Sequence, residues 1–75
     1  MKIKNIGSNQ TELWLENGTV VLFSYETPVC AYVPNEGHIK TNRKYSVTTS
    51  KHINKWLEGS NFKEVDQEVL DNLVK

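Results

Sequence analysis

Cysteine, proline and long apolar segments are all scarce in this sequence of 75 residues, which contains one cysteine and two prolines. A single cysteine, Cys30, cannot form a disulfide within the chain, whereas small secreted scaffolds usually carry several. No run of about 18 apolar residues occurs, so no membrane-spanning helix is predicted. The N-terminal segment with Lys2 and Lys4 also lacks the apolar stretch of a signal peptide. We therefore expect a soluble protein in a reducing cytoplasm.

Neither positive nor negative charge is in excess, because 9 Lys and Arg residues balance 9 Asp and Glu residues. Hydrophobic residues make up 37% and charged residues 24% of the chain, which is typical of folded domains rather than disordered chains. The length allows one domain, residues 1–75, and a domain of this size buries only roughly 60% of its unfolded surface. A deep substrate cleft would cost so small a domain much of its stability. We therefore expect no enzymatic activity.

Patterns typical of catalytic or metal sites are absent as well. His38 and His52 have no second ligand at a spacing such as His-x3-His. Cys30 stands at an alternating strand position between apolar neighbours, which indicates a buried small side chain rather than a nucleophile. Ser24 belongs to no Ser-His-Asp constellation, and residues 64–68 lack the pattern of a calcium loop. The sequence therefore predicts no catalytic residue, no metal site and no cofactor.

The strongest structural signal is Asn17-Gly18, which lies between the strand-like segments 11–16 and 19–25. Type I′ hairpin turns need positive φ at both central residues, and Asn-Gly tolerates this geometry best. A two-residue loop here fixes a register that pairs Trp14 with Val21. We therefore predict a β-hairpin with that register.

This register gives the hairpin two unlike faces. One face is aliphatic and carries Leu13, Leu15, Val20 and Leu22. The other face mixes charged and polar residues with Trp14, Val21 and Phe23. An apolar cluster on an uncovered sheet face marks an interface, so Trp14, Val21 and Phe23 are the candidate protein-interface residues. The alternative is that the N-terminal segment or neighbouring strands cover them.

Further strands are predicted on both sides of the hairpin. Residues 29–33 form a strand after Thr27-Pro28, and residues 2–6 form an edge strand whose lysines oppose aggregation. A loop opens at Pro34, and strand pairing resumes either near His38 or only at residues 44–48. The sequence does not decide whether residues 1–7 are ordered or which path residues 34–44 follow.

Two helical patterns complete the chain. Ser50 is a suitable N-cap for a short helix over residues 51–58, and Gly59 is suited to end it. A second amphipathic pattern runs from about Asp66 to Val74. The fold class is therefore α+β: a small antiparallel β-sheet of three to five strands near the N-terminus, followed by two C-terminal helices packed on one sheet face.

Charge is balanced overall but not locally. Residues 38–55 contain five basic residues and no acid, whereas residues 58–71 contain five acids and one lysine. The basic residues are Lys40, Arg43, Lys44, Lys51 and Lys55, and they are the candidate nucleic-acid-binding residues. Tyr32 and Tyr45 would add base stacking if they point outward. The alternative is an ordinary solvated loop.

Most of the chain after Ser8 resembles a family of small uncharacterised proteins encoded by bacteriophages and other bacterial mobile elements. The resemblance lies in the segments 17–25, 27–29 and 45–57. It implies no catalytic or ligand residues, and it favours binding of host proteins or nucleic acid in the cytoplasm of a bacterial host cell. A strand at residues 44–48 followed by two helices would also be similar to the ribbon-helix-helix DNA-binding plan, although the first helix is too short for it.

The sequence therefore favours a small non-catalytic phage-type binding module. Protein–protein contact through Trp14, Val21 and Phe23, with a second copy or a host protein, is the leading expectation because the net charge is zero. Nucleic-acid binding through the basic segment 38–55 is the alternative.

Overall fold

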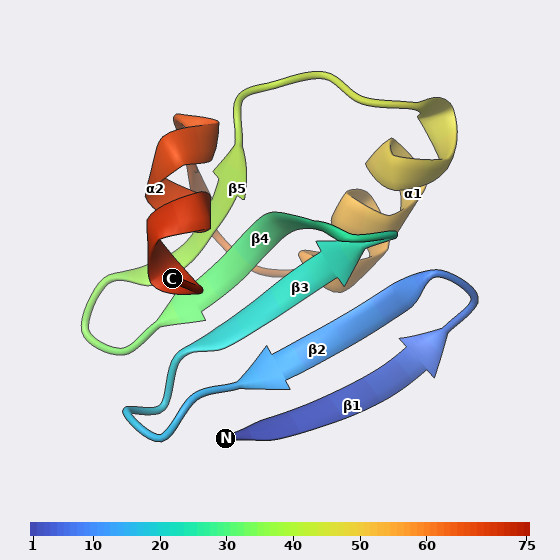
Figure 1. The fold of residues 1–75 in the computed structure, drawn as a ribbon. Helices are drawn as coiled ribbons and strands as arrows, with labels where there is room; N and C mark the ends of the chain where they lie inside the picture. Colours follow the sequence, from blue (N-terminus) through green and yellow to red (C-terminus); the bar gives the residue numbers. More distant parts are fainter.

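The computed structural model describes residues 1–75, which form a six-stranded sheet and two helices (Figure 1). The strands are β1 (Lys2–Gly7), β2 (Gln10–Trp14), β3 (Val20–Ser24), β4 (Thr27–Val33), β5 (Gly37–Thr41) and β6 (Phe62–Val65). The helices are α1 (Val47–Trp56) and α2 (Gln67–Leu73). The strands lie in sequence order, and β1 to β5 pair antiparallel. The α+β class is confirmed.

β6 is a strand that the sequence pattern does not predict. It pairs parallel with β5, because the chain passes through α1 before it returns to the sheet edge. The sheet is therefore mixed and has one strand more than the expected three to five. With four residues, mostly exposed, β6 carries little of the alternating pattern by which strands are recognised.

The turn between β2 and β3 has three residues rather than two. Leu15 N donates to Thr19 O at 2.8 Å, and Gly18 N donates to Leu15 O at 3.1 Å. Gly18 has a φ of 91°, whereas Asn17 keeps a negative φ and accepts a hydrogen bond from Thr19 N through its side chain. Loop residues 16–18 thus form the hairpin in which only the last position needs a glycine. The predicted type I′ turn is wrong.

The longer loop shifts the register by one residue. Trp14 pairs with Val20 and Leu13 pairs with Val21, in place of the predicted partners. A shift of one residue exchanges the two faces of one strand relative to the other. Leu13 and Leu22 therefore lie on opposite faces, and the predicted aliphatic face does not exist.

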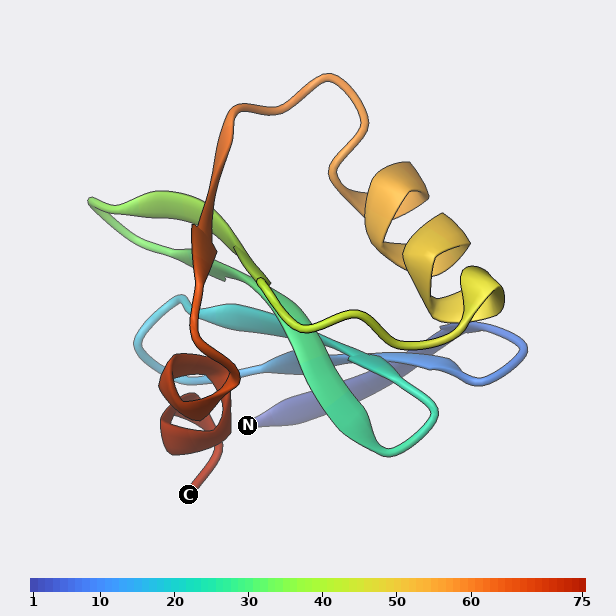
Figure 2. The ribbon, with the colours of Figure 1, turned by 90° about the horizontal axis from the view of Figure 1, so that it is seen from above.

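Both faces of the sheet are covered at its centre. Leu22 packs with Ile53 and Leu57 of α1, whereas its neighbour Val21 packs with Leu70 of α2. Adjacent strand residues point to opposite faces, so the two helices lie on opposite sides of the sheet, as Figure 2 shows. The expectation that both helices pack on one face is wrong. The unbroken apolar run in β3 is typical of a strand that is covered on both sides.

A β-bulge in β4 adds to the core beneath α1. Leu22 pairs with Cys30, but the next residue pairs with Pro28, so Val29 is the extra residue. Val29 and Cys30 both pack in the cluster under α1 and are fully buried. The expectation that Cys30 is a buried small side chain is confirmed, and Pro28, which pairs with Phe23, lies directly beside the bulge, where strands tolerate proline.

The start of α1 differs from the prediction by four residues. Its N-cap is Ser46, whose Oγ accepts a hydrogen bond from Thr49 N at 3.2 Å, and Ser50 lies inside the helix. Residues 44–48 are therefore no strand, and pairing resumes at β5 near His38. The ribbon-helix-helix plan is wrong for this chain because no strand precedes α1 directly. The second helix is confirmed, with Asp66 as its N-cap.

Buried polar contacts fix each helix on the sheet. The hydroxyl of Ser24 in β3 lies 2.9 Å from Thr49 Oγ1 and 2.9 Å from His52 Nδ1, both on α1. Gln67 Nε2 at the start of α2 donates to Pro28 O at 2.7 Å. Tyr45 donates its hydroxyl hydrogen to Gln67 Oε1 at 2.9 Å, which ties the loop before α1 to α2.

Candidate functional site

The three predicted interface residues do not form one patch. Val21 is 0% exposed beneath α2, and Phe23 is half-buried on the same face. Trp14 is 44% exposed and lies on the opposite face, because it pairs with Val20 rather than Val21. The register shift therefore separates residues that the predicted register would place on one face.

The most distinctive surface feature is a row of side chains that crosses all six strands on the α1 side. Successive pairing partners from β1 to β6 are Lys2, Trp14, Val20, Tyr32, His38 and Phe62. Directly paired residues point to the same face of a sheet. Four of these side chains are rings, and we call Trp14, Tyr32, His38 and Phe62 the aromatic row. Tyr32 is 38% exposed and Phe62 is 47% exposed.

Rings of the aromatic row contact one another and their surroundings. The ring centroids of Tyr32 and His38 are 5.0 Å apart, and those of His38 and Trp56 are 5.9 Å apart in an edge-on arrangement. Lys40 Nζ lies 4.9 Å from the centre of the Phe62 ring. With about 4.8 Å between neighbouring strands, the row spans roughly 19 Å from Trp14 to Phe62.

One carboxylate orients both tryptophans. Trp14 Nε1 donates to Glu12 Oε1 at 3.1 Å, and Trp56 Nε1 donates to Glu12 Oε2 at 2.8 Å. Trp56 is half-buried and packs against the core beneath α1, so the acceptor expected for its indole is Glu12. Because Glu12 accepts two hydrogen bonds, it also fixes the orientation of the first ring of the row.

Three of the five basic candidates line a cavity between β5 and α1. The cavity measures about 290 Å³, and we call it the basic pocket. Its lining includes Lys40, Arg43 and Lys44 from β5 and the loop that follows, Ser50 and Asn54 from α1, and one acid, Glu64 of β6. The structure thus brings together charged and hydrogen-bonding side chains from β5, α1 and β6 that are up to 24 positions apart in the sequence.

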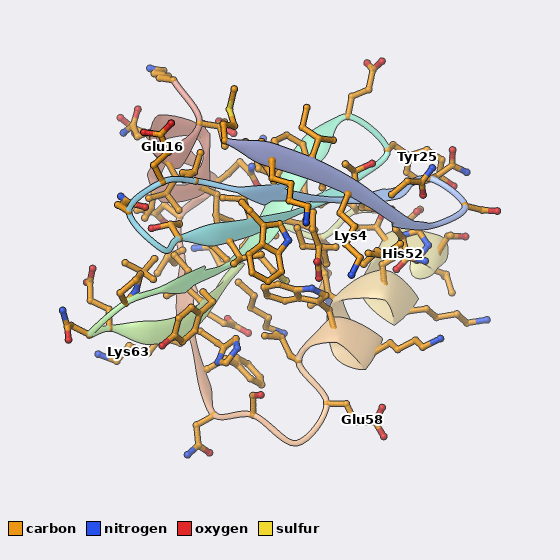
Figure 3. All side chains as sticks on the ribbon, turned by 90° about the horizontal axis from the view of Figure 1, so that it is seen from below. Lys4, Glu16, Tyr25, His52, Glu58 and Lys63 are labelled. Carbon is orange, nitrogen blue, oxygen red and sulfur yellow. The ribbon has the colours of Figure 1, made fainter.

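The remaining charges show how this side of the molecule is organised. Lys40 Nζ lies 3.5 Å from Glu64 Oε2, so this lysine is paired. Lys51 and Lys55 are exposed on α1 outside the basic pocket. Figure 3 shows Lys4 of β1 on the side of the sheet that carries α1, in agreement with its pairing to Glu12 and through it to Leu22.

Basic and acidic residues are sorted by the two helices. α1 contains Lys51 and Lys55 and no acid, whereas α2 contains Glu68 and Asp71 and no basic residue. The helices lie on opposite faces, so the lysines of α1 and the acids of α2 lie on opposite sides of the sheet, whereas Glu64 of β6 lies on the α1 side beside Lys40. The local charge imbalance in the sequence thus becomes a spatial one.

An open apolar groove occupies the other face, where α2 does not reach. It is lined mainly by Ile3, Leu13, Phe23 and Tyr25 and measures about 330 Å³. Ile3 is 69% exposed and Tyr25 is 51% exposed. Phe23 is therefore the one predicted interface residue that belongs to an open apolar surface on this face.

Ser24 and His52 form a hydroxyl–imidazole pair that the sequence did not reveal, since 28 positions separate them. Ser24 is buried and is also bonded to Thr49, so the pair ties β3 to α1. Burial raises the pKa of the Cys30 thiol to about 12, so the thiol is protonated at neutral pH. The structure contains no group of three His, Cys, Asp or Glu side chains that could hold a metal ion.

Comparison with known proteins matches residues 1–72 to the model of a family of unknown function, DUF8033. The chain belongs to the DUF8033 family. The matched residues include the whole sheet, α1 and nearly all of α2, so the aromatic row and the basic pocket both lie within the family domain. No curated protein and no solved structure matches the chain. Neither helix of the structure is long and apolar enough to span a membrane.

Proposed function

We propose that the protein is a small non-catalytic module that binds nucleic acid with the α1 side of its sheet. The observation that supports this proposal is the separation of charge across the sheet. Lys2, Lys4 and the basic pocket lie on the α1 side, whereas the acids of α2 lie on the other. Phosphate groups are bound by lysine and arginine, which supply most of the affinity for nucleic acids.

A net charge of zero is compatible with a nucleic-acid partner, because the basic and acidic residues of the two helices lie on opposite sides of the sheet. The molecule measures 24 Å along its shortest axis, which exceeds the Debye length. That length is about 8 Å at physiological ionic strength, so the acids of α2 are largely screened from a ligand on the α1 side. The resemblance to proteins of bacteriophages and other mobile elements is compatible with this partner, since it favours binding of host proteins or nucleic acid over enzymatic activity.

The basic pocket can be tested with a double substitution, Arg43→Ala with Lys44→Ala. Binding of a labelled oligonucleotide is measured by fluorescence anisotropy between about 20 and 200 mM salt. Each lost phosphate contact reduces the slope of log K against log salt by about 0.7–0.9, so the double variant is expected to bind more weakly and with a flatter salt dependence.

The matched control is Lys63→Ala with Lys75→Ala, which removes the same charge from residues that do not line the basic pocket. This control is expected to retain most of the affinity and the slope. Equal losses in both double variants, or no loss in the Arg43/Lys44 variant, would contradict the assignment of the basic pocket to phosphate binding.

A second candidate function is contact with a second copy of the chain or a host protein. The apolar groove around Ile3 and Phe23 favours it, because the groove is open and lies beside the edge strand β1, which has a partner on one side only. The lysines in β1 oppose direct pairing of two such edges, so this contact would use the groove rather than the strand backbone.

A further inference from the structure

We infer that the nucleic acid bound by this protein is single-stranded and that its unpaired bases stack on the aromatic row. The inference rests on the proposed function and adds the strand state of the ligand. In a duplex the faces of the bases are already stacked on their neighbours. An aromatic side chain can therefore stack only on a base that is unpaired or displaced.

The exposure of the row supports this ligand. Trp14, Tyr32 and Phe62 each keep roughly two fifths of their surface in contact with solvent on one sheet face. Burial of aromatic side chains stabilises a protein. A line of exposed rings therefore indicates a surface that binds a partner. At roughly 19 Å, the row has the scale of RNA-binding sheets on which aromatic side chains stack two or three bases.

The rings are also held in place before any ligand arrives. Glu12 fixes the Trp14 indole at 3.1 Å, and His38 contacts Tyr32 on one side and Trp56 on the other. Lys40 packs over Phe62. A surface that is already ordered loses little conformational entropy on binding, which favours a weak but repeated interaction such as base stacking.

Charges beside the row distinguish nucleic acid from a protein partner. Lys2 pairs with Trp14 and so lies beside the end of the aromatic row, and Lys4 and Lys40 lie two residues further along β1 and β5 on the same face. The carboxylates on this face have partners, since Glu12 accepts from two indoles and Glu64 pairs with Lys40, whereas Lys2 and Lys4 form no ion pair. Lysine is depleted in protein–protein interfaces but is suited to phosphates next to stacked bases.

The test compares a single-stranded 12-nucleotide oligothymidylate with a duplex of the same length. Wild-type protein is expected to bind the single strand at least about 10-fold more tightly at equal salt. Phe62→Leu retains an apolar strand residue but removes the ring, and it is expected to weaken single-strand binding about 10-fold while duplex binding is unchanged. Phe62→Trp is expected to retain single-strand binding.

Two controls separate stacking from loss of structure. Tyr25→Leu removes an exposed ring that lies outside the row and is expected to leave binding unchanged. Phe62 is at an exposed sheet edge, so Phe62→Leu is expected to unfold in urea with nearly the wild-type midpoint. A variant that unfolds early is replaced by Tyr32→Leu, which tests the same row on β4.

The remaining outcomes show whether nucleic-acid binding or the stacking of unpaired bases on the aromatic row is contradicted. Equal binding of single strand and duplex, lost in the Arg43/Lys44 variant but not in Phe62→Leu, would overturn the inference and leave the proposed function intact. Absence of binding to either oligonucleotide at about 20 mM salt would overturn both. Self-association that is abolished by Phe62→Leu would identify the row as a protein interface instead.

Discussion

At the scale of single residues, Cys30 shows how burial sets chemistry. Its side chain is fully buried in the cluster beneath α1, and desolvation raises its pKa from 9.0 to about 12. Lys40 opposes the shift through its charge but does not cancel it. The thiol therefore acts as a small apolar side chain, and its conversion to a thiolate is coupled to unfolding.

This coupling predicts a loss of stability at alkaline pH. Below about pH 9 the thiol is neutral in the folded and unfolded states, so Cys30 adds no pH dependence. Between pH 9 and 12 the unfolded chain loses the proton while the folded chain keeps it, which lowers the free energy of unfolding as pH rises. At pH 10.5 the loss is about 2 kcal/mol.

The measurement is urea unfolding of wild type and Cys30→Ala at pH 7 and pH 10.5. The variant is less stable at pH 7 because it leaves a small cavity, but it lacks the part of the alkaline loss that Cys30 causes. Identical losses in both proteins between the two pH values would show that the thiol is accessible in the folded state.

At the scale of elements, α1 shows why helix ends are hard to read from a sequence. Ser46 and Ser50 are both good N-cap residues, and both precede a helical pattern. What decides between them is a tertiary contact, since Thr49 reaches the buried hydroxyl of Ser24 only if the helix has already begun. A contact between residues 25 positions apart is invisible to local patterns.

The two serines provide a matched pair of substitutions. Ser46→Ala removes the side chain that accepts from Thr49 N and is expected to lower the free energy of unfolding by about 1 kcal/mol. Ser50→Ala lies on the exposed side of α1 and is expected to change it by less than about 0.5 kcal/mol. Chemical denaturation measures both values, and the reverse order would place the N-cap at Ser50.

Strand elements were predicted more completely than their pairing. The segments that became β1 to β4 are all recognisable from alternation and turn residues, and α2 begins where its pattern begins. The register failed because Asn17-Gly18 is compatible with a two-residue loop and with a three-residue loop. Packing of Val21 and Leu22 against different helices selects the longer one.

At the scale of the whole molecule, the sheet divides the surface into two chemically different faces. The basic candidates could be found by counting charges, because they lie close together in the sequence. The aromatic row could not be found, because it requires the correct β2–β3 register and the unpredicted strand that carries Phe62. A site built from one residue per strand leaves no local motif.

The opposite face yields a prediction about assembly. Phe23→Ser places a hydroxyl in the apolar groove and is expected to reduce any self-association that persists at high salt, with the monomer still folded. Light scattering across protein and salt concentrations measures the mass. A mass equal to one chain for wild type at every concentration would show that the groove does not join two copies, and a folded Phe23→Ser variant with wild-type association would place the contact elsewhere.

The parallel pairing of β6 affects how steadily the aromatic row is presented. The five strands from β1 to β5 form a meander whose neighbours join through short turns, so their contacts close small loops. β6 reaches β5 only after residues 42–61 have closed a much larger loop, at a greater entropic cost. The outermost ring, Phe62, therefore lies on the strand whose pairing closes the largest loop of the sheet, and the aromatic row without that strand would have three rings.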